Sequence, residues 1–529
     1  MAKLTGEMVI GFATVRGSLG SMKAFSPTAN AEIDAPDFGL GGTDDVERAA
    51  SLAESAFDAY RALPLERRAK FLEAIADNIL ELGDELLDRA HLESGLPLAR
   101  LQSERGRTVG QLRLFAEVVR TGNFQRPVID HALPERQPLP RSDLRLMMIP
   151  VGPVAVFGAS NFPLAFSVAC GDTASALAAG APVVVKAHNA HLGTSELVAR
   201  AVQKAAQQQE MPDGVFSLLI GAGREIGEAL VAHPAIKAVG FTGSRQGGLA
   251  LLRIANARPE PIPVYAEMSS INPVFLFPGA LEHRADEIAR GFVTSLTMGA
   301  GQFCTNPGLV LAVDGPDVRR FEKAAVEALA KTDAQTMLTP GIFEAYCDGI
   351  SGIKKLNGVD VLAEGLPSNA QFNAAQARLF AVDADKLLRN EELTAEVFGP
   401  ASIVIRAKDF EELLAIAEHL EGQLTATLQI EPSDHDAARR LLPVLERKAG
   451  RILMNGFPTG VEVCHAMVHG GPFPATTSSM HSSVGASAVE RFLRPVCYQD
   501  VPDDLRHEAL KEGNPQHLLR KIDGRFAPT

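Results

Sequence analysis

The sequence predicts an α/β fold in which parallel strands alternate with helices. Short apolar runs suited to buried strands recur along the chain, and amphipathic segments such as TSELVARAVQKAAQQQ lie between several of them. These runs form two alternating regions, one on each side of about residue 280. The first region holds VAVFGA, PVVVKA, VFSLLIG, IKAVGFTG and PVYAEM, and the second holds PGLVLAV, ASIVIRA and RILMN. A length of 529 residues allows roughly two to four domains.

Helical patterns dominate the first part of the chain. An amphipathic helix is expected to begin at Thr43, whose side chain can serve as the N-cap. A second helix is expected to follow Pro64 and to end near Gly95, and a third covers residues 98–120. Residues 138–150, PLPRSDLRLMMIP, are expected to form two short extended arms around an Arg-Ser-Asp turn.

The composition argues against several classes of function. The formal net charge of −13 disfavours nucleic acid or a membrane surface as a partner. Apolar runs stay below about 18 residues, and the run in MAKLTGEMVIGF is too short for a signal peptide, so a cytoplasmic protein is expected. The cysteines lack CxxC spacing, which argues against a disulfide framework and a zinc ribbon. They are Cys170, Cys304, Cys347, Cys464 and Cys497.

Polar side chains stand where several expected strands end. Asn161 follows VAVFGA, Lys186 ends VVVK and Glu267 ends VYAE, and α/β folds place their sites at the carboxyl ends of strands. An Asn amide can stabilise an oxyanion, and a Lys can contact a ribose or a phosphate. A carboxylate in an apolar setting can have a raised pKa and act as a general base. Taken singly, a turn residue, a solvated strand end and a surface charge explain them as well.

Cys304 lies in MGAGQFCTN, residues 298–306. A thiolate is a strong nucleophile once its pKa is lowered, and free backbone N–H groups at a turn can do this. A small buried thiol without chemistry is the alternative. Two glycine-containing turns, at residues 221–227 and 240–244, could approach a pyrophosphate. Their spacing does not match the GxGxxG fingerprint, so each is a weak signal alone.

The order of these motifs is more specific than any one of them. NFP, a Lys after VVV, FTGS, a Glu before NP, GQFC and EVFGP follow one another, and the set resembles the aldehyde dehydrogenase superfamily from about residue 40 to 500. The resemblance implies that Cys304 attacks an aldehyde to form a thiohemiacetal, whose oxyanion is held by Asn161 and the Cys304 amide. Loss of hydride gives a thioester, and Glu267 activates the water that releases the acid.

The resemblance also implies a nicotinamide cofactor and no metal. Asn189 stands where NAD-preferring members carry a Glu, and Arg224 could pair with a 2′-phosphate. NADP is therefore expected, with NAD possible. Lys186 would bind a cofactor ribose. The remaining residues implied at this site are Gly243 and Ser244 near the pyrophosphate, and Glu396 and Phe398 at the nicotinamide end.

Departures from the common pattern narrow the resemblance. Ser269 and Ser270 replace two glycines, and HGGPFPAT and FLRPVCYQ occur near the end of the chain. These features are similar to the subgroup of 2,5-dioxovalerate (α-ketoglutaric semialdehyde) dehydrogenases and NADP-dependent fatty aldehyde dehydrogenases. The first implies oxidation of 2,5-dioxovalerate to 2-oxoglutarate, and the second, kept as the alternative, a medium- or long-chain aldehyde. Cys170 is expected to be a buried variant residue, not a second nucleophile.

The resemblance implies an apolar substrate tunnel near Cys304. A carboxylate on the substrate would need a cation, and three arginines of the third helix are candidates, with Arg105 preferred over Arg107 and Arg113. The expected tunnel residues are Phe162, Phe166, Phe303 and Phe473.

Three structural parts and an oligomer are expected from the resemblance. Residues 1–137 and 154–280 would form a Rossmann-like cofactor domain, and residues 281–475 a catalytic domain. Residues 138–153 would form a β-hairpin flap with residues 476–529, joining copies into a homodimer or homotetramer. Two rival hypotheses are a non-catalytic relative, which should lack Cys304, Asn161 or Glu267, and an esterase that uses Cys304 without cofactor.

Overall fold

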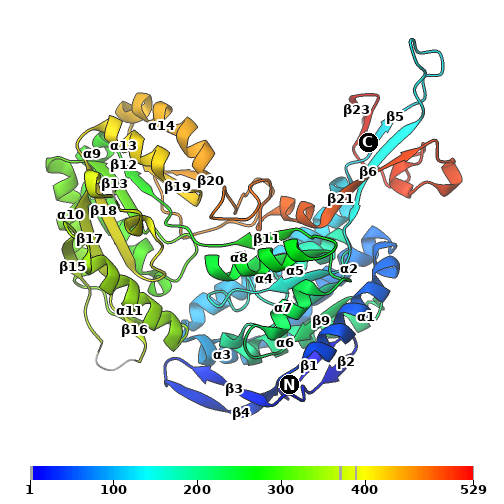
Figure 1. The fold of residues 1–529 in the computed structure, drawn as a ribbon, viewed down its shortest axis with the longest axis horizontal. Helices are drawn as coiled ribbons and strands as arrows, with labels where there is room; N and C mark the ends of the chain where they lie inside the picture. Colours follow the sequence, from blue (N-terminus) through cyan, green and yellow to red (C-terminus); the bar gives the residue numbers. More distant parts are fainter. Residues whose placement is uncertain (1–3, 369–371, 388–389, 528–529) are drawn as a thin grey trace.

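The computed structural model describes residues 4–368, 372–387 and 390–527. Two seven-stranded sheets and one five-stranded sheet organise this part of the chain. In Figure 1 the first large sheet and its helices form the lower right lobe, and the second forms the left lobe. The five-stranded sheet extends as an arm at the upper right.

The first sheet has the strand order β11-β10-β7-β8-β9-β1-β2. Its five parallel strands are the five runs predicted from the sequence. Two strands from the N-terminal segment, which the sequence did not predict, extend one edge: β1 pairs antiparallel with β9, and β2 pairs antiparallel with β1. The strands are β1 (Met8–Ile10), β2 (Ala13–Val15), β7 (Val154–Phe157), β8 (Val183–Lys186), β9 (Phe216–Leu219), β10 (Ala238–Thr242) and β11 (Val264–Glu267).

Helices cover both faces of this sheet, so its central strands are buried without alternation. The expected helix over residues 98–120 is confirmed as α4. The helices are α1 (Thr43–Arg61), α2 (Leu65–Glu81), α3 (Gly83–Ser94), α4 (Leu98–Thr121), α5 (Asp172–Ala179), α6 (Leu192–Gln208), α7 (Glu225–Ala232) and α8 (Arg245–Ala257).

Two predictions about helix ends were wrong in detail. Gly42, not Thr43, is the N-cap of α1, and its N–H donates to Oδ2 of Asp45 at 3.0 Å. The single helix expected after Pro64 is split into α2 and α3, because Gly83 has a left-handed φ of 57° at the break. Gly95 ends α3 with φ 69°, as expected.

The second sheet has the order β15-β17-β18-β13-β12-β19-β20 and is parallel except for β15. Because β12 belongs to it, the change of sheet falls before β12 and not at residue 280 as expected. Its strands are β12 (Val274–Leu276), β13 (Leu309–Val313), β15 (Asp360–Glu364), β17 (Arg378–Asp383), β18 (Ala401–Ala407), β19 (Gln423–Gln429) and β20 (Ala449–Met454). Its helices are α9 (Pro278–Thr297), α10 (Pro316–Leu329), α11 (Pro340–Lys355), α12 (Ala384–Leu387), α13 (Phe410–His419) and α14 (His435–Lys448).

The arm contains the expected hairpin, but its first strand lies earlier in the chain. β5 pairs antiparallel with β6, and residues 131–143 connect them, so residues 138–142 belong to the turn and not to an arm. The segment after residue 476 completes this sheet, as expected, because β21 pairs with β6 and β22 with β5. The strands are β5 (Val128–Asp130), β6 (Leu144–Pro150), β21 (Leu493–Gln499), β22 (Arg520–Ile522) and β23 (Arg525–Ala527).

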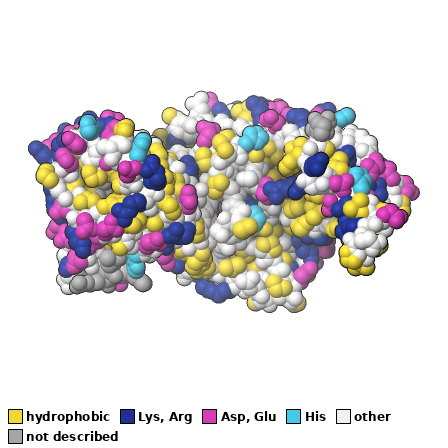
Figure 2. Space-filling view, turned by 90° about the horizontal axis from the view of Figure 1, so that it is seen from above, with side chains coloured by type: hydrophobic (Ala, Val, Ile, Leu, Met, Phe, Trp, Pro, Cys, Tyr) yellow, Lys and Arg dark blue, Asp and Glu magenta, His cyan; other side chains and the backbone are white. Residues whose placement is uncertain are grey.

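Two further pairs of strands complete the described part of the chain: β3 (Ser21–Ser26) with β4 (Ala31–Gly39), and β14 (Gln335–Thr336) with β16 (Ala374–Ala375). Among the described helices, none combines the length and the apolar character needed to cross a bilayer. Figure 2 shows acidic and basic side chains intermixed at both ends of the face it displays.

Candidate active site

Three of the predicted residues lie at the carboxyl ends of parallel strands in the first sheet. Phe157 at the end of β7 pairs with Lys186 at the end of β8, and Asn161 lies in the loop that follows β7. Glu267 ends β11 and pairs with Thr242 of β10. Asn161, Lys186 and Glu267 therefore leave the same edge of the sheet, where parallel α/β folds bind their ligands.

The loop that carries Cys304 is held by side chains on both sides. After α9 the chain forms a short 3₁₀ turn over Met298–Gly301, with left-handed φ at its centre. Nδ2 of Asn272 donates to the carbonyl oxygens of Cys304 and Asn306, both at 2.9 Å. Oε1 of Gln302 accepts a hydrogen bond from the N–H of Leu338 at 3.0 Å. These contacts fix the position of the thiol relative to the sheet edge.

The Cys304 thiol lies beside two buried ionisable side chains, His469 and Glu267. Nε2 of His469 lies 3.4 Å from Sγ of Cys304 and 2.8 Å from Oε1 of Glu267. The hydroxyl of Ser483 donates to the other carboxylate oxygen of Glu267 at 2.5 Å. His469 and Glu267 are buried, with side-chain exposures of 1% and 3%. One ligand atom of each of the three groups lies within 4.8 Å of the others, a spacing that a metal ion could also use.

The pKa values of this cluster differ from both sequence-based expectations. Burial acts to raise the pKa of Glu267, but His469, Ser483 and Cys304 together hold it below its ordinary value. The pKa of the Cys304 thiol is raised well above its ordinary value, first by burial and then by the Glu267 charge. The resting cluster therefore contains a protonated thiol beside a carboxylate, where the sequence predicted a lowered thiol pKa and a raised carboxyl pKa.

Asn161 faces the same loop. Its Nδ2 donates to the carbonyl oxygen of Gln302 at 2.9 Å, two residues before Cys304. The backbone carbonyl oxygen of Asn161 accepts a hydrogen bond from Nη2 of Arg100 at 2.8 Å. A primary amide has two N–H donors, so one remains for a ligand beside the thiol.

A cavity of about 380 Å³ opens onto Cys304, within the ~300–1,000 Å³ range of small-molecule sites. Three of the four predicted phenylalanines line it: Phe162 contacts Phe166 and Phe303 edge to face, with ring centroids 5.5 and 5.4 Å apart. Phe473 does not line this cavity. Its side chain is 57% exposed and packs against Arg245 of α8.

Arg105 was also a wrong prediction for the substrate site. Its Nη1 donates to the carbonyl oxygen of Gly83 at 2.6 Å, where α3 begins, and it does not line the cavity. Arg113, farther along α4, pairs with Asp77 at 2.9 Å on the surface. Arg100 and Arg107 of the same helix line the cavity instead.

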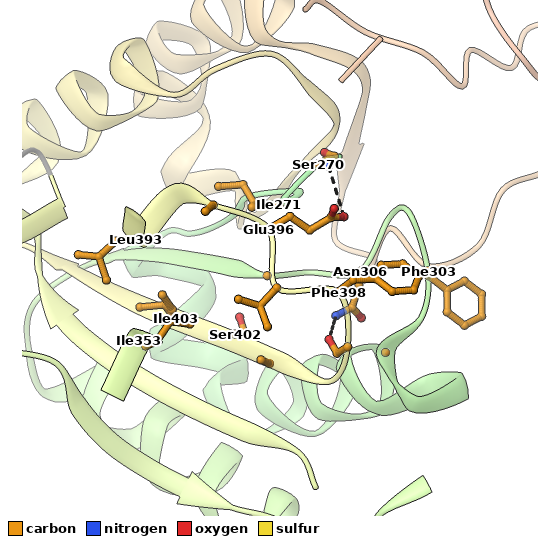
Figure 3. Close-up of a pocket in the computed structure, with 16 residues that line it drawn as sticks. Ser270, Ile271, Phe303, Asn306, Ile353, Leu393, Glu396, Phe398, Ser402 and Ile403 are labelled. Carbon is orange, nitrogen blue, oxygen red and sulfur yellow. Dashed lines mark hydrogen bonds between the residues drawn. The ribbon is translucent and has the colours of Figure 1, made fainter. Parts of the chain in front are cut away.

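Two of the residues predicted to bind the cofactor, Glu396 and Phe398, line a pocket beside the Cys304 loop, to which Gly301 and Asn306 also contribute. Nζ of Lys186 donates to Oδ1 of Asn189 at 3.0 Å, and loss of hydration lowers the pKa of Lys186 to about 8. Figure 3 shows Glu396 directed toward Ser270, whose N–H donates to it at 3.5 Å. Loss of hydration raises the pKa of Glu396 to about 7. Phe398 lines the pocket drawn in Figure 3, together with Glu396.

The chemistry of these groups fits a dinucleotide. Glu396 borders a cleft of about 500 Å³ that Ser269, Arg245 and Gln423 also line. A carboxylate and an ammonium with few protein partners suit ribose hydroxyls and phosphates. Gly243 follows β10, and Ser244 is the N-cap of α8, its hydroxyl accepting from the N–H of Gly247 at 3.2 Å. The predicted partner of a 2′-phosphate, Arg224, is exposed at the start of α7.

Comparisons with known proteins agree with this geometry. The pattern of the aldehyde dehydrogenase family matches residues 15–496. The chain belongs to the aldehyde dehydrogenase family. It is 64% identical to "Alpha-ketoglutaric semialdehyde dehydrogenase 2" of Azospirillum brasilense, over 99% of both chains. It is 50% identical to "Alpha-ketoglutaric semialdehyde dehydrogenase" of Acinetobacter baylyi, over 92% of both chains.

Solved structures confirm the aldehyde dehydrogenase fold. A mutant of aldehyde dehydrogenase C from Pseudomonas syringae, in complex with NAD+ and octanal, superposes with a TM-score of 0.77 at 22% identity. That match covers 93% of this chain and 96% of the other. A 1-pyrroline-5-carboxylate dehydrogenase gives a TM-score of 0.78 at 21% identity, covering 93% and 92% of the two chains.

Sequence reasoning missed several residues of this aldehyde dehydrogenase site. His469 is the first residue of HGGPFPAT, and the sequence alone assigned it no role. A His in a motif that departs from the family pattern was the signal that could have identified it. Gln423 had no signal, yet its Oε1 accepts hydrogen bonds from Ser270, Ile271 and Asn272 at 2.9–3.1 Å. Ser270, which replaces a common glycine, also donates to Oδ1 of Asn272 at 2.9 Å.

Cys170 is buried, as expected, and donates to Oε1 of Gln111 at 3.1 Å. Burial raises the pKa of Cys170 to about 12, which makes this thiol a poor nucleophile.

Proposed function

We propose that this chain oxidises 2,5-dioxovalerate to 2-oxoglutarate with NADP as the oxidant. The observation that carries the proposal is the contact of the Cys304 thiol with the buried His469–Glu267 pair, at the end of a cavity lined by aromatic rings and two arginines. Relatives that share 64% and 50% of its residues are named alpha-ketoglutaric semialdehyde dehydrogenases.

The first step is attack of Sγ on the aldehyde carbon. Because the resting thiol is protonated, its proton must leave as the S–C bond forms. We assign this proton to the carboxylate of Glu267, because Nε2 of His469 lies 2.8 Å from its Oε1 and lowers its pKa, as a hydrogen-bond donor does. The oxygen of the former aldehyde gains negative charge, and the remaining N–H of the Asn161 amide is the side-chain donor that we assign to it.

When bound, the nicotinamide supplies the oxidising chemistry by accepting a hydride from the substrate carbon, which leaves a thioester on Cys304. Lys186 and Glu396 would hold the cofactor riboses, and Phe398 would pack beside the nicotinamide. Asn189 carries no charge to repel a 2′-phosphate, and the exposed Arg224 would pair with it. These are the reasons for proposing NADP ahead of NAD.

Release of the product needs the same base again, so Glu267 must first pass the thiol proton on to solvent. Glu267 would take a proton from water as its oxygen attacks the thioester carbon. The C–S bond then breaks, the acid leaves, and Cys304 recovers its proton. The lowered pKa of Glu267 keeps it ionised at neutral pH, which this role requires, although burial opposes ionisation.

A substrate panel tests the proposal against the alternative of a fatty aldehyde. Formation of NADPH or NADH is followed at 340 nm with 2,5-dioxovalerate and with decanal, and kcat/KM is compared. We expect 2,5-dioxovalerate to be preferred by about tenfold or more, and NADP to be preferred over NAD. A tenfold preference for decanal would overturn the substrate assignment. Turnover without any signal at 340 nm would instead indicate an esterase.

We further propose that the protein works as a homo-oligomer in the cytoplasm. The arm formed by β5, β6, β21, β22 and β23 projects from the lobes and carries exposed apolar side chains, including Phe526 at 75% exposure. The expected three-part division places this arm as the contact that joins two or four copies. All five cysteines are free, as suits a reducing compartment.

A further inference from the structure

Arg107 lines the Cys304 cavity with unused hydrogen-bond donors. It lies on α4, and its Nε and Nη2 are buried without a hydrogen-bond partner among the residues that the structure describes. In this part of the chain no carboxylate lies within 4.0 Å of its guanidinium. Buried donors are normally satisfied, so two idle donors on one charged group point to a ligand.

The position of this guanidinium connects it to the reacting thiol through two rings. Its Cζ lies 4.7 Å from the centroid of the Phe166 ring, and Phe166 packs against His469 with centroids 6.1 Å apart. His469 in turn contacts Cys304. Although burial raises the pKa of Cys304, the Arg107 charge acts in the opposite direction, as expected for a cation facing the same cavity.

The second arginine of the cavity is partly engaged by protein groups. Arg100 donates to the carbonyl oxygen of Asn161 and stacks on Phe162 and Phe303, with its Cζ 5.1 and 4.6 Å from their ring centroids. Its Nε also lies 4.0 Å from Oε2 of Glu104. Nη1 of Arg100 is buried without a hydrogen-bond partner among the described residues, whereas Arg107 has two such nitrogens, Nε and Nη2.

The carboxylate on the same stretch of α4 is directed to the loop that follows β7. Glu104 lines the cavity and lies nearer to Arg100 than to Arg107. Oε1 of Glu104 accepts hydrogen bonds from the N–H groups of Leu164 and Ala165 at 2.8 and 3.0 Å, which hold it against this loop. A substrate carboxylate would supply the partner that Arg107 lacks.

We infer that Arg107 is the residue that selects the substrate, by binding the carboxylate at the end of the chain opposite the aldehyde. The inference rests on the proposed function, because it assumes an oxo-acid aldehyde. A guanidinium offers two parallel N–H donors to a carboxylate, a geometry that a neutral aldehyde cannot use. The aromatic rings between Arg107 and Cys304 would then contact the carbon chain.

The test compares one charged and one neutral aldehyde of equal length in the wild type and three variants. kcat/KM is measured for 2,5-dioxovalerate and for pentanal in the wild type, in Arg107→Gln and in Arg113→Gln. Arg113 is the matched control, since it lies on the same helix but on the surface, paired with Asp77. Arg107→Lys keeps the charge and loses the paired donors. Thermal unfolding of each variant checks the fold.

In Arg107→Gln we expect kcat/KM for 2,5-dioxovalerate to fall by about 30-fold or more, mainly through KM, as for lost charge-assisted hydrogen bonds. The value for pentanal should change far less, and Arg107→Lys should lie between. Arg113→Gln should match the wild type with both substrates. Glutarate is a dicarboxylate that resembles the product and is not turned over. It should inhibit Arg107→Gln more weakly than the wild type.

Each other outcome has a distinct meaning. An equal fall with both aldehydes would show a structural role for Arg107 and contradict the inference. If the wild type prefers 2,5-dioxovalerate and Arg107→Gln has the same kcat/KM as the wild type, the inference is overturned and the proposed function stands. A wild type that does not prefer 2,5-dioxovalerate over pentanal would overturn the proposed function, and the inference with it.

Discussion

The ionisable groups near the Cys304 thiol and those near Glu396 differ in what shifts their pKa values. On the thiol side, Glu267 contacts His469 and Ser483, and these partners lower its pKa in spite of burial. On the side that we propose for the cofactor, Glu396 has a pKa raised to about 7 and Lys186 a pKa lowered to about 8, in both cases mainly through lost hydration. The partners of Glu267 outweigh its burial, whereas Ser270 beside Glu396 and Asn189 beside Lys186 do not.

This difference indicates which part of the site is complete before a ligand binds. Groups whose burial is balanced by hydrogen bonds and opposite charge are held in place by the protein. Groups that carry a cost of burial gain stability from a ligand that supplies the missing partners. The account therefore predicts a preorganised catalytic cluster and a cofactor site that is completed by the cofactor itself.

Removal of the nucleophile should have the largest effect. Cys304→Ala should lower the rate of NADPH formation by about 10³-fold or more, because no other group at this position can hold the acyl chain. Cys347→Ser is the control, since Cys347 is exposed on α11. Initial rates at 340 nm with saturating aldehyde provide the measurement. Comparable rates in the two variants would remove Cys304 from the chemistry.

Removal of His469 tests whether the catalytic cluster is complete without cofactor. His469→Asn should lower kcat/KM by about 10²-fold, because Glu267, the base that we assign to the thiol, loses a partner that lowers its pKa. His465→Asn, at an exposed position of the same segment, is the control. Steady-state kinetics over a range of pH, with thermal unfolding to check folding, provide the measurement.

The raised thiol pKa makes a separate prediction for the protein without cofactor. Because the neutral thiol is favoured, iodoacetamide should modify Cys304 slowly at pH 7, and the rate should rise only above the ordinary thiol pKa of about 8.5. Mass spectrometry of the alkylated peptide locates the site. An inflection well below pH 8 would show a preformed thiolate and contradict the description of the cluster.

Cofactor affinity should depend on pH more modestly. Glu396 can accept from two hydroxyl donors, and more strongly, when it is a carboxylate, so affinity should fall below pH 7, by up to about tenfold per unit, as it becomes protonated. Lys186 is charged below its pKa of about 8, so affinity should also fall above pH 8. Titration of NADP by calorimetry from pH 5.5 to 9.5 measures this. Glu396→Gln should abolish the fall in affinity below pH 7. If this fall is unchanged in the variant, Glu396 is not the group that causes it.

The sequence predicted the strands and the order of the motifs because both depend on local pattern. Five buried strands of the first sheet matched their apolar runs, and the residues at their ends met where parallel strands must bring them together. The N-terminal edge strands β1 and β2 were missed, since three residues carry too little periodicity to distinguish. The split between α2 and α3 depended on the conformation of one glycine, Gly83.

The errors at the site concern groups whose surroundings depend on the packing of the whole chain. Arg105 and Arg107 are two residues apart on α4 and therefore point to different sides of it, so that Arg105 contacts Gly83 and Arg107 lines the cavity. Phe473 follows His469 by four residues, yet is exposed beside Arg245. The direction of the Glu267 pKa shift depends on His469 and Ser483, more than 200 residues further along the chain.

The most direct test of the completed catalytic cluster is a single-turnover experiment on Glu267→Gln. Enzyme and NADP are mixed rapidly with 2,5-dioxovalerate, and absorbance at 340 nm is followed from the first milliseconds. If Glu267 activates the water that releases the acid, the variant should form about one NADPH per active site in a burst. Steady turnover should then be slower than in the wild type by about 10²-fold or more. Slow formation of NADPH from the start, without a burst, would contradict the role assigned to Glu267.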